Sequence, residues 1–255
     1  MRAAEFPILE YDPTPTAVVN PSQCLPHIEA PEYAVLCFFS DAIEKLLADM
    51  PHHVLYGLKS VMGTWPIYQV RWGGRDVVLA NPRVGAPLAA GTLEALIAFG
   101  CKKIIVCGGA AVLDQAMSYG QIIVVSSAVR DEGTSYHYLP PSREVEASAT
   151  AVAAIKAVLG EHDIPYTVGK VWTTDAFYRE TIERVALRKR EGCLAVEMEA
   201  AAMFAVAKFR GVTLGQFLLC GDDVSGSQWD RRGWGQRTDG HEKALSLAFE
   251  TCLSM

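Results

Sequence analysis

The stretch LAVEMEAAAMF, residues 194 to 204, places two glutamates two positions apart inside an otherwise apolar run. Alanine and methionine favour helix, and Ala200 and Met203 fall at helical spacing, so we predict a core helix here. Two positions turn a helical side chain by roughly 200°, so Glu197 and Glu199 cannot share a face. Either both occupy the first helical turn, where negative charge is favoured, or they serve a ligand, because carboxylates are seldom buried without a partner.

The whole chain has the composition of an ordinary globular protein. Its 255 residues are 50% hydrophobic and 20% charged, which suits one large α/β domain, with two small domains as the alternative. The formal net charge is −6, and no cluster of lysines and arginines is interleaved with aromatics, so we expect no nucleic-acid partner.

Cysteine usage and hydropathy indicate the compartment. The seven cysteines show no C-x-x-C pair and no zinc-ribbon spacing, and most sit in apolar runs, which is typical of a reducing compartment. Acidic residues interrupt the N-terminal segment where a signal peptide needs an apolar core, and no apolar run reaches the length of a membrane span. We therefore expect a cytoplasmic protein with no membrane partner.

The order of the predicted elements indicates the fold class. Prolines crowd the start of the chain, which predicts an irregular arm over residues 1–31, lying on the body or on a neighbouring subunit, before an α/β domain over residues 32–255. Periodicity predicts strands at 33–39, 102–107, 121–127, 166–172 and 215–220, a hairpin of 67–72 and 75–80, and helices at 41–50, 87–100, 145–159, 177–190 and 241–253. This alternation predicts a single-domain mixed β-sheet flanked by helices on both faces, a three-layer α/β/α fold.

Two aspartates follow the apolar strand predicted at 215–220. Ligands of such sheets collect at the carboxyl ends of the strands. Asp222 and Asp223 are either turn residues or a carboxyl pair in which mutual repulsion raises one pKa and makes a general acid. The glutamate segment leads into the same strand, which favours the second interpretation.

Four segments between residues 26 and 250 carry a family resemblance. The most specific is AVEMEAAAMFAVAKFRGV (195–212) with the strand and Asp222 after it; the others are TTDAFYRE (173–180), GAPLAAGTLEALIAFGCKKIIVCGGAAVL (85–113) and PHIEA (26–30). Together they resemble the nucleoside phosphorylase family, which holds purine nucleoside phosphorylases, uridine phosphorylases and adenosylhomocysteine/methylthioadenosine nucleosidases. The resemblance implies the α/β fold of that family and cleavage of the N-glycosidic bond of a nucleoside.

The resemblance also implies roles for individual residues. Glu199 would hold the ribose hydroxyls and stabilise the positive charge that develops on the sugar, and Met198 would pack on the sugar. Phe177 would stack on the base, which the carboxylic acid of Asp222 would protonate as it leaves. Glu197 is counted with the substrate-binding residues.

His27 bears on assembly. By the resemblance, its side chain would reach the 5′-hydroxyl of a nucleoside in a neighbouring subunit; the alternative is an ordinary surface histidine in the arm. The family implies a homo-oligomer, either a dimer or a trimer of dimers, with a nucleoside and inorganic phosphate as small-molecule partners. No cofactor and no metal are expected, since the histidines lack metal-site spacing.

The chain departs from the family pattern at the phosphate anchors. Phe39 and Ile43 stand where the family has a glycine and an arginine after its first strand. Val106 and Gly109 stand where it has a second arginine and a Ser or Thr. Two phosphate anchors of the family are therefore missing.

Other residues of the chain can replace these anchors. Arg83 precedes a predicted helix N-terminus, itself an anion site, and Arg130 opens RDEGTSYHY (130–138); each arginine would otherwise form surface ion pairs. Gly108 and Gly109 allow close backbone approach. We expect phosphorolysis to free base and pentose 1-phosphate, with inorganic phosphate as co-substrate. The alternatives are a nucleosidase that uses water and a nucleoside-binding protein without turnover.

Overall fold

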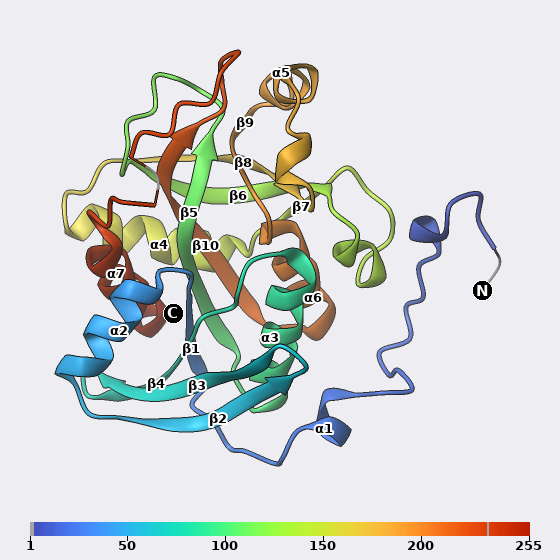
Figure 1. The fold of residues 1–255 in the computed structure, drawn as a ribbon. Coiled ribbons are helices and arrows are strands. Elements are labelled where there is room, and N and C mark those ends of the chain that lie inside the picture. The colour runs from blue at the N-terminus through green and yellow to red at the C-terminus, as the bar shows by residue number, and fades with distance from the viewer. Residues whose placement is uncertain (1–2, 234) are drawn as a thin grey trace.

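The computed structural model describes residues 3–233 and 235–255, and a β-sheet with helices on both faces forms its body (Figure 1). The strands are β1 (Tyr33–Cys37), β2 (His52–Ser60), β3 (Gly63–Trp72), β4 (Arg75–Ala80), β5 (Lys103–Val112), β6 (Ile122–Asp131), β7 (Glu144–Glu146), β8 (Tyr166–Thr174), β9 (Cys193–Glu197) and β10 (Thr213–Asp223). The α-helices are α1 (Pro21–Cys24), α2 (Ser40–Asp49), α3 (Ala86–Ala98), α4 (Ala149–Glu161), α5 (Ile182–Arg190), α6 (Ala200–Arg210) and α7 (His241–Ser254). Short 3-10 helices are η1 (Pro7–Leu9), η2 (Thr134–His137) and η3 (Phe177–Arg179).

The strands form one mixed sheet, which confirms the predicted fold class. Their order is β10-β6-β8-β9-β5-β1-β4-β3-β2, with β7 paired to β6. An additional pairing of β10 with β5 closes β5, β10, β6, β8 and β9 into a ring, from which β1, β4, β3 and β2 extend. Periodicity could not predict this ring, because it describes each strand separately and not its distant partners.

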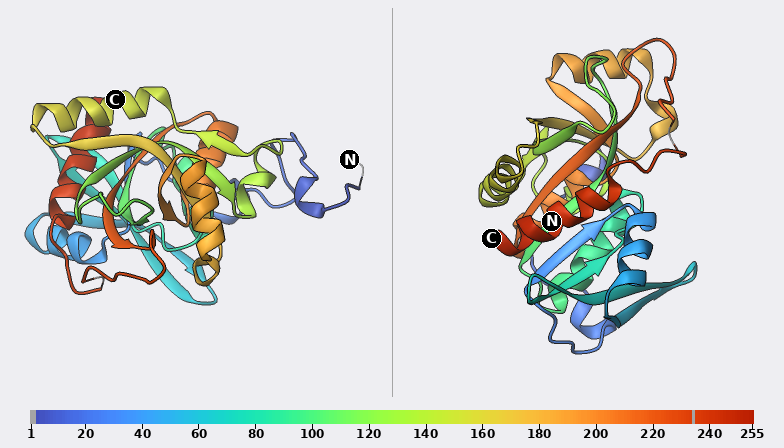
Figure 2. Two further views of the ribbon diagram at one scale, coloured as in Figure 1. Left: turned by 90° about the horizontal axis from the view of Figure 1, so that it is seen from above. Right: turned by 90° about the vertical axis from the view of Figure 1, so that its left-hand side faces the viewer.

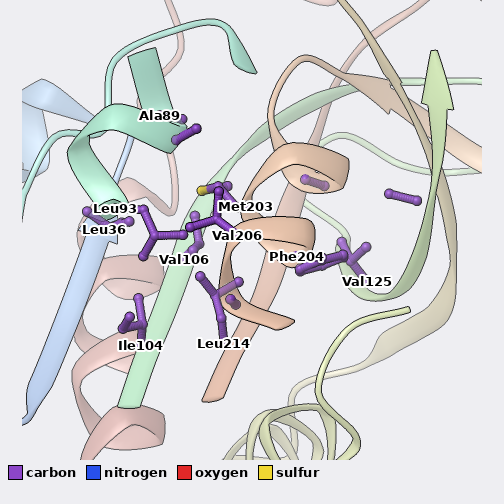
Figure 3. Close-up of a cluster of buried hydrophobic side chains, with 14 of the residues drawn as sticks. Leu36, Ala89, Leu93, Ile104, Val106, Val125, Met203, Phe204, Val206 and Leu214 are labelled. Atoms are coloured by element: carbon purple, nitrogen blue, oxygen red, sulfur yellow. The ribbon is translucent and has the colours of Figure 1, made fainter. Parts of the chain in front are cut away.

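Helices cover the two faces of the sheet in separate groups. Helices α3 and α6 lie on one face, whereas α2, α4 and α7 lie on the other (Figures 1 and 2). Figure 3 shows Leu93 of α3 and Met203 of α6 gathered near Val106 of β5 in the first of these layers. The apolar helical faces are therefore buried against the sheet, the interaction that supplies most of the stability of such layers.

The stretch 194–204 is a strand followed by a helix, so the prediction of one continuous helix is wrong for its first half. Strand β9 ends at Glu197, and α6 begins at Ala200. Strand β9 pairs with β8 in parallel and with β5 in antiparallel orientation. These long-range hydrogen bonds override the local helix propensity of the segment.

Several other boundaries also differ from the prediction. Strand β5 continues through Gly108 and Gly109, where we expected it to end, and β10 continues to Asp223. Val145 belongs to β7 and not to the helix that became α4. The charged helix expected at 177–190 is divided into η3 and α5, and β2 was not predicted. The predicted hairpin is confirmed as β3 and β4.

The N-terminal part of the chain is largely exposed and runs away from the body (Figure 1). It is attached by few hydrogen bonds: Arg210 donates from Nη1 to the Pro15 carbonyl (2.9 Å), and the Ala30 N–H donates to the Phe99 carbonyl (2.9 Å). Residues 1 and 2 of the expected arm lie outside the described residues. The docking of this arm on a neighbouring subunit stays a prediction.

The cysteines divide by exposure. Cys24, in α1, is exposed, whereas the other six are buried as free thiols. Burial raises the pKa of the Cys220 and Cys252 thiols to about 12. Within residues 3–233 and 235–255, no helix is both long and apolar enough to cross a membrane.

Candidate active site

A cavity of about 850 Å³ opens where β1, β5, β9 and β10 end. Its lining is mostly apolar, with a few polar side chains, as in many small-molecule sites. Another cavity, of about 520 Å³, lies beside the start of α7 and contains none of the residues singled out from the sequence. The larger cavity brings together these sequence-predicted residues: Phe177, Glu197, Met198, Glu199, Asp222 and Gly109.

Glu197 is held by the chain itself. Its carboxylate accepts hydrogen bonds from the backbone N–H groups of Glu199 (2.8 Å) and Ala200 (2.7 Å) and from the Thr173 hydroxyl. The same Thr173 oxygen accepts from the Ala201 N–H (3.0 Å). These contacts satisfy donors at the start of α6 that no helical carbonyl can reach. Glu197 therefore fixes the turn that presents Glu199.

Glu199 projects from this turn toward the cavity. Its Oε1 accepts from the Gly85 N–H, at the start of α3, where a backbone φ of 103° favours glycine. Burial, and after it the nearby charge of Glu197, raises the pKa of Glu199 to about 8. Burial raises the pKa of Glu197 to about 7, against the opposing effect of its hydrogen bonds. Because Glu197 accepts more donors, its charged form is favoured over that of Glu199.

Asp222 and Asp223 are neighbours with different surroundings. Asp222 lines the cavity, and its Oδ2 accepts from the Trp229 indole N–H (2.6 Å). Burial raises its pKa, which favours the protonated acid. Asp223 is buried and paired with Arg232 (2.7 Å). Of these two aspartates, only Asp222 lies where it can donate a proton to a ligand in the cavity.

An aromatic wall stands beside Asp222. The rings of Phe177 and Tyr178 lie 4.0 Å apart, and both side chains line the cavity. Glu180 follows them and also lines it; burial, and then the charge of Asp222, raises the pKa of Glu180 to about 7. No described residue donates a hydrogen bond to the Glu180 carboxyl. The sequence analysis missed this residue, although it ends the quoted segment TTDAFYRE.

The Phe39 end of the cavity is occupied by an aromatic stack where the family pattern has its first phosphate anchor. The Phe39 ring stacks on the His241 ring at 3.9 Å, and His241 Nδ1 lies 3.0 Å from each carboxylate oxygen of Asp41. A Cβ added to Gly109 would lie 3.9 Å from the Phe39 ring, so this ring adjoins the glycine. His241 was missed, because the histidines were judged only for metal-site spacing.

Both arginines expected to bind phosphate lie outside the described lining of the cavity. The guanidinium group of Arg130 is buried and donates to Ser135 Oγ (2.9 Å), Ser142 Oγ (2.7 Å) and two backbone carbonyls. Four of its five N–H donors are thus used inside the fold, away from the cavity, so the expectation that Arg130 binds phosphate is corrected. Arg83 lies over the Trp65 ring (4.2 Å) and donates to Thr92 Oγ1 (3.3 Å).

His27 and Gly108 are also absent from the described lining. His27 is exposed in the N-terminal segment, so its role toward a neighbouring subunit stays a prediction. Gly108 is buried, and a Cβ there would come within 2.8 Å of the Phe38 ring. Gly108 is thus required for close packing, and its contact with phosphate stays a prediction.

A model of the phosphorylase superfamily matches residues 32–249, nearly the whole of the sheet and its helices. The chain belongs to the phosphorylase superfamily. This membership confirms the family resemblance of the sequence motifs. It agrees with a cavity that contains the Met198–Glu199 pair, Phe177 and Asp222 together.

Curated members of the phosphorylase superfamily resemble the chain at moderate identity. A guanosine phosphorylase of Halorubrum lacusprofundi is 30% identical over 165 residues, 64% of this chain and 68% of that protein. A DeoD-type purine nucleoside phosphorylase of Dichelobacter nodosus is 27% identical over 206 residues, 78% of this chain and 86% of that protein. A uridine phosphorylase of Treponema pallidum is 28% identical over 213 residues, 78% and 79% of the two chains.

Solved structures of the superfamily share the fold. Uridine phosphorylase from Vibrio fischeri superimposes with a TM-score of 0.75 at 23% identity, covering 93% of this chain and 95% of that one. An AMP nucleosidase from Bacteroides thetaiotaomicron gives a TM-score of 0.70 at 22% identity, with 88% of each chain covered. Among the described residues of this superfamily member, no group of three or more His, Cys, Asp or Glu side chains is arranged to hold a metal ion.

Proposed function

We propose that this protein cleaves the N-glycosidic bond of a nucleoside by phosphorolysis, releasing the free base and a pentose 1-phosphate. The observation that carries the proposal is the meeting of Glu199, Met198, Phe177 and Asp222 in one cavity. Membership in the phosphorylase superfamily and the names of the curated relatives, which are phosphorylases for guanosine, purine nucleosides and uridine, support it.

The two ends of the cavity suit the two halves of a nucleoside. Phe177 and Tyr178 offer flat apolar faces on which a base can stack. Asp222 beside them can donate a proton to the base nitrogen that receives the electron pair of the breaking bond. Met198 and Glu199, at the β9–α6 turn, fit the sugar; the positive charge that develops on the sugar favours ionisation of Glu199, and its carboxylate then stabilises that charge.

The nucleophile completes the reaction. A phosphate oxygen forms a bond to the anomeric carbon on the face opposite the base, as the bond from that carbon to the base nitrogen breaks. The proton that neutralises the base comes from Asp222. Inorganic phosphate is the proposed co-substrate, and the chemistry of this step requires no cofactor.

Hydrolysis is the second candidate, and one observation favours it. Phe39, which stands where the family pattern has a glycine after its first strand, adjoins Gly109. Neither Arg83 nor Arg130 reaches the described lining of the cavity. A phosphate ion has fewer charged partners here than the pattern implies, whereas water needs none. A nucleosidase would release free pentose.

The deciding experiment supplies purine and pyrimidine nucleosides to the purified protein with and without phosphate, and identifies the sugar product. Phosphate-dependent base release with pentose 1-phosphate is the expected result. Free pentose formed at the same rate without phosphate would establish the nucleosidase. Saturable nucleoside binding without cleavage of any nucleoside would identify a binding protein.

We further infer a cytoplasmic homo-oligomer, a dimer or a trimer of dimers. Six buried free thiols support the reducing compartment, and an exposed His27 in the N-terminal segment is free to reach a neighbouring cavity. Light scattering coupled to size-exclusion chromatography measures the assembly. A monomer at assay concentration, together with a His27→Ala variant that is as active as the wild type, would contradict this inference.

A further inference from the structure

Gln216 is a buried amide that the protein itself leaves unpaired. It lies in β10 with no exposed surface, and within the described chain neither Nε2 nor Oε1 has a hydrogen-bond partner. An unpaired buried amide is unfavourable and rare in native folds, and a ligand or water commonly satisfies it. Gln121 provides the contrast: its Oε1 accepts from the Ser118 N–H (3.2 Å), and its Nε2 donates to Thr167 Oγ1 (3.1 Å).

The Gln216 side chain belongs to the floor of the active-site cavity. Leu214 and Leu218, two residues to either side on β10, belong to the core cluster beneath α3 and α6, and strand alternation places Gln216 on that face. Val106 is its register partner on β5, and Figure 3 shows Val106 and Leu214 within this layer. Gln216 is also among the residues that line the cavity.

The depth of Gln216 separates it from the groups that serve the base. Asp222 lies six residues further along β10, beyond the irregularity after Cys220, beside Trp229. Gln216 lies further back in the sheet, in line with Val106. A nucleophile must approach the sugar from the face away from the base, so a polar group at this depth is suited to hold it.

The chemistry of an amide defines its partner. The group offers an NH₂ donor and a carbonyl acceptor. Hydrogen phosphate offers the complement, oxygens that accept and a hydroxyl that donates. We infer that Gln216 binds the phosphate co-substrate, with Nε2 donating to one phosphate oxygen and Oε1 accepting from the phosphate hydroxyl. This inference rests on the proposed phosphorolysis.

The electrostatic part of phosphate binding must come from other residues, because the amide is neutral. Arg237 and His241 are the basic side chains in the described lining of the cavity. Arg237 lies over the Tyr119 ring (3.8 Å) and pairs with Asp239 (2.7 Å), whereas His241 is oriented by Asp41. Gln216 then acts as an uncharged positioning contact at the base of an anion subsite.

The test compares Gln216→Met with Gln121→Met. Gln216→Met should lower the affinity of the protein for inorganic phosphate, titrated calorimetrically without nucleoside, by roughly 10-fold, the loss expected for about one hydrogen-bonded contact. The KM for phosphate should rise by a similar factor, while the KM for nucleoside stays within about twofold. Gln216→Glu should weaken phosphate binding further, because its carboxylate repels the anion.

Thermal melts distinguish a binding role of Gln216 from a structural one, because loss of a structural residue would lower the melting temperature. Gln216→Met should melt at the same or a higher temperature than the wild type, because it removes an unpaired buried amide. Gln121→Met should melt lower, because it breaks two made hydrogen bonds, and should bind phosphate normally.

Three results would overturn the inference: wild-type protein without saturable phosphate binding, a Gln216→Met variant that binds phosphate as the wild type does, or a rise in the KM for nucleoside instead of phosphate. Base release is measured separately. Its absence with every nucleoside would count against the proposed function, while the phosphate titration would still decide the role of Gln216.

Discussion

The cavity contains two carboxyl pairs, and they differ in how the fold treats their charge. Glu197 and Glu199 lie at the β9–α6 turn, where backbone N–H groups and Thr173 hold Glu197 and the Gly85 N–H holds Glu199. At the other end, Trp229 holds Asp222, while no described residue donates to the Glu180 carboxyl. The first pair is fixed before any ligand arrives, and the second is left to exchange a proton with one. Preorganised charge suits the sugar, and a movable proton suits the leaving base.

The largest expected effect tests the proton donor. Asp222→Asn should lower kcat by about 100-fold or more, as the loss of a general acid does, while nucleoside binding survives. Asp223→Asn is the matched control: it should lower the melting temperature, because it weakens the buried pair with Arg232, and change kcat far less. Steady-state kinetics and thermal melts of both variants measure these effects. An unchanged kcat in Asp222→Asn would remove Asp222 from the mechanism.

The next effect separates the two glutamates. Glu199→Gln should cost about 2 kcal/mol of transition-state stabilisation, roughly 30-fold in kcat, because glutamine cannot ionise to oppose the positive charge that develops on the sugar. Glu197→Gln should act mainly on stability, because it disturbs the hydrogen bonds that begin α6. Should melts show Glu199→Gln as the destabilised variant with normal kinetics, the roles are reversed.

The sequence predicted that these glutamates belong to a site better than it predicted their local structure. The resemblance of the Met198–Glu199 segment singled out residues that line the cavity, but helix propensity alone put Glu197 in a helix, whereas pairing with β8 and β5 makes it the end of a strand. Spacing located Asp222 because an apolar strand precedes it. Spacing could not locate Arg83 or Arg130, because whether an arginine reaches a cavity depends on packing between distant elements.

Two polar residues carried signals that could have been used. Gln216 stands inside the apolar run GQFLLC, where an amide is unusual, and Glu180 stands three residues after Phe177. His241 gave no comparable signal, since its contact with Phe39 joins residues about two hundred positions apart in the chain. Such contacts follow from the packing of α7 against β1 and α2 and not from periodicity.

A smaller effect concerns the pH dependence of stability. The unfolded chain releases the proton of Glu199 near the ordinary value of 4.5, whereas the folded protein keeps it until the pKa of about 8. Stability should therefore fall as the pH rises from about 4.5 to about 8, and this contribution should not change above that range. Denaturant titrations at several pH values measure it. Glu199→Gln should flatten the slope, and an equally steep slope in that variant would assign the proton elsewhere.

The smallest expected effect tests whether the charge of Glu180 influences the pKa of Asp222. Glu180→Gln removes the negative charge near Asp222, so the proton of Asp222 should be released at lower pH. Because the acid must be protonated to act, the alkaline limb of the kcat profile should move to lower pH. Glu180→Asp, which keeps the charge, is the control. An unmoved limb in Glu180→Gln would show that the two carboxyls titrate independently.

The distribution of thiols gives this protein a natural labelling site. Cys24 is exposed on the N-terminal segment, three residues before His27, while the remaining six cysteines are buried. A maleimide fluorophore or a nitroxide should therefore attach at one place in the native protein, without engineered substitutions. In the homo-oligomer that we infer, distances between labels on different subunits would then report directly where the segment that carries His27 lies.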